Sequence, residues 1–496
     1  MYYIGYDLGS SSVKAALIDA KTGRSVGVTN YPEKEMAIIA VETGWAEQDP
    51  EAWWKNIAKV TEKLLAQTSI SSNKIKGIGI SYQMHGLVVV DKEGKSLRPS
   101  IIWCDSRAVS IGNDAFTGVG EDKCVSNLLN SPGNFTLSKL KWVKENEPEL
   151  YKKIDKLLLP GDYIALKLTG EATTTISGLS EGIMWDFNQN KPADWLFDYM
   201  GISTDLIPTI VPTFSDQGRV TKSAAEEIGL PVGIPVLYRA GDQPNNALSL
   251  NAFNPGEIAA TGGTSGVVYA ITDSTVTKES SRINNFAHVN YTIDKPRIGK
   301  LLCINGAGIQ YSWMKQNVVS TEDSYNDMNN LAGSVPVGSE GLRILPFGNG
   351  AERMLNNKNE GASIFNLNFN KHNKSHLLRA SLEGIAFSFV YGIEILKNDG
   401  VNISAIRAGN DNLFRSEIFS NTIATLVNTN INIMDTTGAI GAARAAGVST
   451  GDFDTLNDAF SENEHVMTYH PLKDKKAYID TYQIWKNDLE NKYNNN

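Results

Sequence analysis

The first turn of the chain brings together an acid, a glycine, three hydroxyls and a lysine. Asp7 ends an apolar stretch, Gly9-Ser10-Ser11-Ser12 follows it, and Lys14 lies in a second apolar stretch. Two strands joined by such a turn would present backbone N–H groups on one side, where the glycine lets an anion approach. Asp7 could hold Mg²⁺ beside that anion. The pattern is typical of a phosphate-binding hairpin, although an ordinary edge hairpin has the same alternation.

A second stretch with the same plan lies about half a chain length later. Residues 258–270 read as a strand, the turn Gly262-Gly263-Thr264-Ser265, and another strand. Alignment of Gly263 with Gly9 puts Thr261 in the place of Asp7, so the second turn lacks the acid. The pair suggests two related domains that face one nucleotide, with two phosphate clamps and one metal ligand.

The elements that would position these turns alternate between strands and helices in both halves of the chain. We expect a helix that begins at Asp49-Pro50, strands at residues 75–82 and 231–240, and helices at residues 374–391 and 437–446, the last rich in small residues. This alternation predicts an α/β protein. The boundary is expected near residues 251–256, which gives domains of residues 1–250 and 251–496, with a polar tail from about residue 473.

Length and composition limit the class of protein. A chain of 496 residues is too long for one hydrophobic core, so at least two domains are expected. A net charge of −9 without basic runs argues against nucleic-acid binding. No apolar run approaches the roughly 18 residues of a membrane span. Three widely spaced cysteines, Cys104, Cys124 and Cys303, fit buried thiols in a reducing cytoplasm.

Polar motifs follow two of the expected strands. Gly241-Asp242-Gln243 comes after residues 231–240 and opens a helix, which by itself makes Asp242 a helix N-cap. An N-cap aspartate stays ionised, because the helix amides and dipole favour its charge. Gln83-Met84-His85-Gly86 follows residues 75–82. A lone histidine at a strand end is usually a hydrogen-bonded structural residue, so these motifs alone leave their roles open.

Together these motifs resemble the FGGY family of carbohydrate kinases over nearly the whole chain, from Tyr3 to about Gly451. The hairpin turns resemble the two phosphate motifs of the family, and Arg407-Ala408-Gly409-Asn410 resembles its adenosine motif, although Ala408 and Asn410 depart from the usual glycine triplet. Ser381-Leu382-Glu383-Gly384 and Leu345-Pro346 with Glu352-Arg353 resemble further signatures. The resemblance implies the two-domain α/β fold of actin, hexokinase and Hsp70-type ATPases, with an interdomain cleft, and ATP and Mg²⁺ as cofactors.

The resemblance also implies a role for each candidate residue. Asp242 would be the catalytic base, which orients a sugar hydroxyl and accepts its proton late in phosphoryl transfer. Asp242, Met84, His85 and Gln243 would contact the sugar, and Asp7 would bind the metal. The residues expected to bind the nucleotide are Gly9, Ser10, Ser11, Ser12, Lys14, Thr264, Gly306, Gln310, Gly409, Asn410 and Asn412.

Within the family, Gln83–Gly86 and Trp103-Cys104-Asp105-Ser106-Arg107 are most similar to members that phosphorylate D-xylulose, whereas Gln243 has the form found with glycerol. The expected reaction transfers the γ-phosphoryl group of ATP to a terminal hydroxyl of a ketopentose, D-xylulose. Glycerol, gluconate and ribulose are alternative substrates, and a non-catalytic ATP-binding sensor is the alternative from another class. The expected partners are a small-molecule sugar and a second copy in a homodimer, without nucleic acid or membrane, in the cytoplasm.

Overall fold

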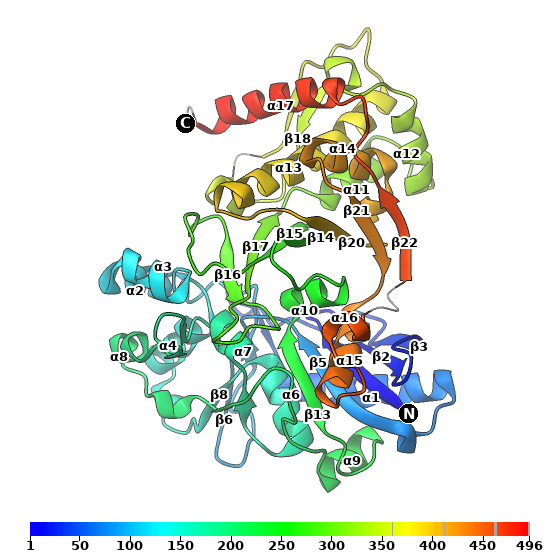
Figure 1. Cartoon of the computed structure of the whole chain (residues 1–496). Helices are drawn as coiled ribbons and strands as arrows, with labels where there is room; N and C mark the ends of the chain where they lie inside the picture. Colours follow the sequence, from blue (N-terminus) through cyan, green and yellow to red (C-terminus); the bar gives the residue numbers. More distant parts are fainter. Residues whose placement is uncertain (360, 411, 461–463, 495–496) are drawn as a thin grey trace.

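Two β-sheets of the same plan form the centres of the two halves of the chain (Figure 1). This computed structural model describes residues 1–359, 361–410, 412–460 and 464–494. The N-terminal sheet has the order β13 (Val236–Gly241), β5 (Ile75–Tyr82), β1 (Tyr2–Leu8), β2 (Val13–Asp19), β3 (Ser25–Tyr31). The C-terminal sheet has the order β16 (Asn284–Ala287), β17 (Ile298–Ile304), β15 (Gly266–Thr272), β14 (Glu257–Gly262), β20 (Ala405–Gly409), β21 (Ile431–Asp435), β22 (Glu464–Tyr469).

The strands of the two sheets run in matching directions. In the N-terminal sheet β1 pairs antiparallel with β2 and parallel with β5, and β5 pairs parallel with β13. In the C-terminal sheet β14 pairs antiparallel with β15 and parallel with β20, and β20 pairs parallel with β21. Both predicted hairpins are therefore confirmed, and each begins one copy of a repeated α/β plan.

Helices cover these sheets on both sides. The main ones are α1 (Pro50–Thr68), α4 (Thr136–Asn146), α6 (Pro160–Thr169), α7 (Ile176–Glu181), α10 (Asp242–Ser249), α11 (Gly308–Asn317), α12 (Tyr325–Gly333), α13 (Lys374–Asn398), α14 (Glu417–Val427), α15 (Gly438–Ser449) and α17 (Lys476–Asn494). Helix α1 begins as predicted, because Asp49 accepts a hydrogen bond from the N–H of Glu51 and Pro50 stands in the first turn. Its buried Trp53 and Trp54 join the core of the N-terminal half.

Helix α15 comes from the C-terminal half but packs on the N-terminal sheet, beside the blue strands of Figure 1. The prediction of a small-residue helix suited to close packing is confirmed: Ala439, Ala442 and Ala443 are fully buried. Their backbone lies against Gly5 of β1 and Gly79 of β5, where a Cβ would overlap the helix. Only a strand that carries glycine at these positions lets the helix approach so closely.

The segment that the sequence presents as a polar tail forms the packed helix α17. Trp485 is 0% exposed and its indole N–H donates to the carbonyl of Ile344 over 2.8 Å. Its ring contacts Phe347 and Phe387, which belong to the core of the C-terminal half. Residues 476–494 are therefore an amphipathic helix whose apolar stripe the polar composition conceals.

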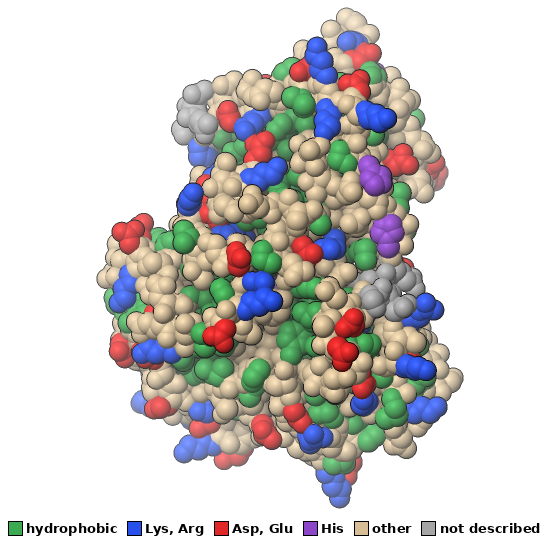
Figure 2. All heavy atoms as spheres, viewed as in Figure 1, with side chains coloured by type: hydrophobic (Ala, Val, Ile, Leu, Met, Phe, Trp, Pro, Cys, Tyr) green, Lys and Arg blue, Asp and Glu red, His purple; other side chains and the backbone are tan. Residues whose placement is uncertain are grey.

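Two surface properties bear on the classes of partner. Figure 2 shows acidic and basic side chains interspersed over this face of both halves, without a single-sign field. None of the helices built from the described residues is long and apolar enough to cross a membrane. Of the three cysteines, all free, Cys124 is buried but Cys104 is exposed, which corrects the expectation of buried thiols.

Candidate active site

A cavity of about 690 Å³ lies between the two halves and collects most of the predicted site residues. The N-terminal half contributes Asp7, Gly9, Ser10, Ser11, Ser12, Lys14, Gln83, Met84, His85, Trp103, Ser131, Gly133, Asn134, Phe135, Asp242 and Gln243. The C-terminal half contributes Ser265, Gly266, Val267, Asn284, Leu301, Cys303, Asn305 and Arg353. The phosphate hairpin, the candidate base and the candidate sugar residues thus share one chamber.

The first hairpin is held in shape by its own backbone and by a buried side chain. The Gly9 N–H donates to the Ser12 carbonyl over 3.1 Å, and the Gln48 amide donates to the Ser10 carbonyl over 2.7 Å. Gln48 is itself buried. The turn is therefore fixed before a ligand arrives, as a phosphate cradle requires.

Asp7 stands at the end of β1 and faces the cavity. One of its carboxylate oxygens accepts a hydrogen bond from the Ser81 hydroxyl over 2.8 Å, which orients the group. The described residues contain no cluster of three or more acidic, histidine or cysteine ligands. This donor set fits Mg²⁺, which binds through one or two carboxylates together with substrate phosphates instead of a protein cage.

Asp242 differs from its expectation in two respects. It is the first residue of α10 and the N-cap is Gly241, so its carboxylate does not cap the helix. Burial, and next the charge of Asp7, raise the pKa of Asp242 to about 7, although backbone N–H groups oppose the shift. The prediction of a firmly ionised aspartate is therefore wrong. A carboxylate with this pKa near neutral pH is suited to proton acceptance.

His85 is held in one tautomer. Its Nδ1 lies 2.9 Å from the backbone carbonyl of Glu181, at the end of α7, so Nδ1 must carry the hydrogen and Nε2 is left as an acceptor. Burial lowers the pKa of His85 to about 3, with the charge of Lys139 next, so the ring is neutral. Phe135 and Phe286 pack against the ring with centroids 4.8 Å and 5.1 Å away.

A buried lysine, which the sequence analysis did not identify, supports the part of the cavity lining that contains Met84 and His85. Lys139 of α4 is 0% exposed, and its ammonium donates to the carbonyls of His85 (2.8 Å) and Ile102 (3.0 Å). Burial lowers the pKa of Lys139 to about 7. The lysine thereby joins the Met84-His85 turn to the segment that carries Trp103. Its place in an amphipathic helix gave no signal of this role.

The segment that follows Trp103 is held in place by the buried side chain of Arg107. The Arg107 guanidinium binds Asp105 over 2.7 Å and lies over the ring of Trp45, 3.9 Å from its centroid. Arg107 and Asp105 are almost fully buried, whereas Trp103 is 53% exposed and lines the cavity. The predicted motif thus consists of a buried ion pair, Asp105 with Arg107, that supports one aromatic residue, Trp103, at the cavity wall.

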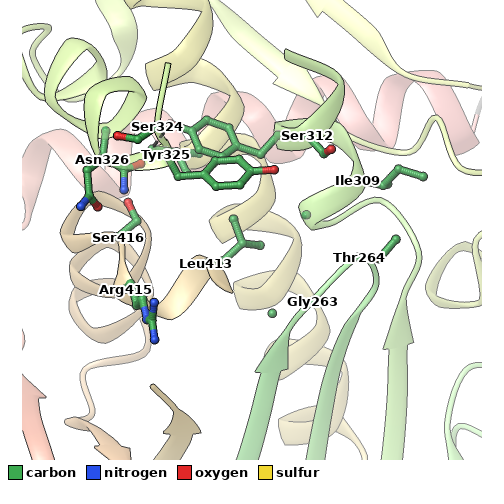
Figure 3. Close-up of a pocket in the computed structure, with 15 residues that line it drawn as sticks. Gly263, Thr264, Ile309, Ser312, Ser324, Tyr325, Asn326, Leu413, Arg415 and Ser416 are labelled. Atoms are coloured by element: carbon green, nitrogen blue, oxygen red, sulfur yellow. Dashed lines mark hydrogen bonds between the residues drawn. The ribbon is translucent and has the colours of Figure 1, made fainter. Parts of the chain in front are cut away.

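A second pocket of about 490 Å³ lies in the C-terminal half (Figure 3). It is lined by Gly262, Gly263, Thr264, Gly308, Ile309, Tyr311, Ser312, Ser324, Tyr325, Asn326, Asn329, Leu382, Leu413, Arg415 and Ser416. Tyr311 and Tyr325 stack with centroids 5.9 Å apart. The second hairpin forms one end of this pocket, so a ligand in it can extend from the tyrosines to Thr264.

Of the other predicted nucleotide residues, none that the structure describes lines this pocket. Gly306 is buried and its N–H donates to Glu352 over 3.1 Å. Gln310 instead lines a separate apolar hollow of about 350 Å³. Gly409 and Asn410 lie at the end of β20, where the Asn410 carbonyl accepts from the pocket residue Arg415 over 2.9 Å. The side chain of Asn412 lies outside the described part.

The architecture defines a class of protein, and comparison with known proteins identifies it. Residues 2–249 match the N-terminal domain and residues 258–450 the C-terminal domain of the FGGY family of carbohydrate kinases. The chain belongs to this family, which confirms the family and the actin-like two-domain fold predicted from the sequence.

Individual relatives match this chain over nearly the full length of both proteins. The chain is 28% identical to a xylulose kinase of Staphylococcus xylosus, with 98% of this chain and 99% of that protein covered. It is similar to the crystal structure of xylulose kinase from Rhodospirillum rubrum, with a TM-score of 0.88, 25% identity and 99% of both chains covered. A glycerol kinase of Plasmodium falciparum solved with ADP has a TM-score of 0.88 at 21% identity, over 99% of this chain and 98% of that one, and shows the fold alone.

Proposed function

We propose that this chain transfers the γ-phosphoryl group of ATP to the terminal hydroxyl of D-xylulose. The observation that carries the proposal is the single cavity in which Asp242 and the Met84-His85 pair meet the first phosphate hairpin. A sugar kinase requires a carboxylate that accepts a proton, side chains that bind the sugar, and a loop that binds phosphate, all in one cavity. The names of the relatives support the choice of sugar.

In this proposal Asp242 is the general base. The sugar hydroxyl oxygen forms a bond to the γ-phosphorus, the bond to the β,γ-bridging oxygen breaks, and its electron pair leaves with ADP. The hydroxyl proton passes to the Asp242 carboxylate. Mg²⁺ held by Asp7 would neutralise charge on the phosphates. Lys14 and the amides of Gly9, Ser10, Ser11 and Ser12 would stabilise the same charge from the N-terminal half.

The sugar wall selects its ligand by hydrogen bonding. Since the Glu181 carbonyl leaves His85 Nε2 as an acceptor, His85 would bind a sugar hydroxyl, not a keto oxygen. Met84 offers an apolar surface to the carbon chain, and Gln243 offers both donor and acceptor. A site with these polar groups rejects a shorter polyol, because the groups would be left unpaired.

The nucleotide would span the remaining space. We place its purine in the pocket of Tyr311, Tyr325 and Leu413, with the phosphates between Thr264 and the first hairpin. In this assignment residues 1–250 bind the sugar and the first phosphate contacts, and residues 251–496 bind the rest of the nucleotide. Three free cysteines fit the proposed cytoplasmic setting.

The test is ADP release measured with a coupled assay over D-xylulose, D-ribulose, glycerol and gluconate. D-Xylulose should give the highest kcat/KM, and glycerol a value lower by at least about tenfold. A higher kcat/KM for another member of the panel would overturn the sugar and leave the kinase assignment intact. Absence of sugar-stimulated ADP release with every member would favour the ATP-binding sensor.

A further inference from the structure

The C-terminal half contributes several described residues to the lining of the central cavity, and among them Arg353 carries a charge. It begins the short 3-10 helix η4 (Arg353–Leu355), directly after Glu352. The buried Glu352 carboxylate accepts the N–H groups of Asn305 (2.9 Å) and Gly306 (3.1 Å), which follow β17. This clamp fixes the start of η4 against the strand end, so Arg353 is presented by a rigid support.

Among the described residues, the guanidinium of Arg353 has no hydrogen-bond or ion-pair partner, and its Nε is buried without an acceptor. Several other arginines of the same half are paired with carboxylates, such as Arg343 with Asp488 (2.5 Å) and Arg379 with Glu383 (2.7 Å). A buried guanidinium nitrogen without an acceptor is costly, and the side chain lines the cavity, so an anionic ligand bound there would supply the missing partner.

The surroundings of Arg353 place it near the reacting groups. Its positive charge contributes to the low pKa of His85 and opposes the rise of the pKa of Cys303, and the charge of Asp242 also reaches Cys303. Arg353 therefore lies within electrostatic reach of His85 and Cys303, and it lines the same cavity as His85 and Asp242. Lys14 lines the same cavity from the N-terminal half.

We propose that Arg353 is a catalytic residue that binds the non-bridging oxygens of the phosphoryl group while it passes from ATP to the sugar. The proposal rests on the phosphotransfer proposed above. The guanidinium stays protonated throughout: it donates hydrogen bonds to the phosphoryl oxygens, while the sugar hydroxyl proton goes to Asp242. A planar fork of donors matches phosphate geometry, and one such contact in a desolvated site stabilises the charge of the transition state.

The first test separates kcat from KM. Arg353→Met should lower kcat by at least about 100-fold, with the KM for sugar and for ATP changed by less than about threefold. Arg353→Lys should recover part of the loss, since a point charge replaces the fork. The matched control is Lys371→Met, which removes an exposed cation of the same half and should leave kcat unchanged. An effect of Arg353→Met on the sugar KM alone would overturn the proposal and make Arg353 a sugar-binding residue.

Two further measurements distinguish a direct role of Arg353 in phosphoryl transfer from a purely structural role, and they can be made even if the proposed sugar is wrong. Methylguanidine should restore at least about tenfold of kcat to Arg353→Ala in the same folded sample, and methylammonium should not. MgADP with aluminium fluoride and sugar, a transition-state mimic, should bind the wild type at least about tenfold more tightly than Arg353→Met, with equal affinity for MgADP alone.

These results discriminate between the two proposals. Turnover of sugar by the wild type together with a normal kcat in Arg353→Met would overturn the role of Arg353 and leave the kinase function standing. Arg353-dependent binding of the mimic by a wild type that turns over no sugar would support Arg353 and overturn the proposed function. Unchanged mimic binding in Arg353→Met would overturn the role of Arg353 in either case.

Discussion

The carbonyl oxygen of Ala439 occupies the space that a side chain on Gly5 would need. Ala439 belongs to α15 in the C-terminal half, and Gly5 lies in the middle of β1, which carries Asp7 at its end. On the neighbouring strand, a Cβ on Gly79 would overlap the backbone of Ala442. A helix from one half thus covers the strands that support the phosphate hairpin of the other, and the two halves are joined through this packing.

Gly79→Ala should therefore destabilise the protein. The added methyl group has only backbone atoms in front of it, so α15 must shift, and we expect a loss of about 1–3 kcal/mol in the free energy of unfolding. Gly333→Ala is the matched control, since a Cβ there meets nothing within 4 Å. Urea denaturation of both variants measures the difference. An equal stability of the two variants would contradict the close packing of α15.

Asp242→Asn should abolish sugar phosphorylation while ATP binding stays nearly intact. The amide keeps the shape of the side chain but cannot accept the hydroxyl proton, so kcat should fall by about 10²–10⁴-fold. Rapid-quench turnover and nucleotide titration calorimetry measure the two effects. Substantial turnover by a correctly folded Asp242→Asn protein would refute the base assignment.

The pKa of Asp242, raised to about 7 by burial and by Asp7, predicts the acid limb of the pH profile. A raised pKa means that the carboxyl is protonated, and inactive as a base, below this value. The kcat/KM for sugar should therefore fall by about tenfold per pH unit below pH 7. His85 stays neutral over this range because its pKa is lowered to about 3. A profile that is flat from pH 8 to pH 5.5, or a residual activity of Asp242→Asn with the same limb, would show that another group is responsible.

His85→Ala should raise the KM for sugar much more than the KM for ATP. The Nε2 acceptor is lost, so a sugar hydroxyl loses its partner, at a cost of about tenfold or more in KM. His470→Ala, an exposed histidine on the far edge of the C-terminal half, serves as the control. Initial rates with each substrate varied in turn provide both constants. Equal changes in the two KM values would assign His85 a structural role.

The fold was predictable where local patterns repeat, as in the two hairpins, and less so where a partner decides the structure. Residues 476–494 are polar on average, and only their packing on Phe347 shows which side is buried.

In the site, glycine and acid motifs at strand ends were found, because parallel strands bring their ends together. Lys139 and the tyrosine pocket were missed, since each is assembled from segments that share no motif: Lys139 of α4 binds the carbonyls of His85 and Ile102, and the pocket joins the second hairpin and helices α11 and α12 to Leu413. The ionisation of Asp242 was misjudged, because burial beside Asp7 is a tertiary property.

Binding of sugar and nucleotide should close the two halves onto each other. The central cavity is lined by both halves, with Asp242 on one side and Ser265 and Arg353 on the other, while Thr264 lines the neighbouring pocket. We therefore expect the two halves to approach each other when both ligands are bound. Closure on sugar would also keep water from the γ-phosphoryl group, so ATP alone should be hydrolysed slowly. Small-angle scattering with D-xylulose plus a non-hydrolysable ATP analogue should give a smaller radius of gyration than either ligand alone. Identical curves in all states, together with rapid ATP hydrolysis in the absence of sugar, would contradict a closing cleft.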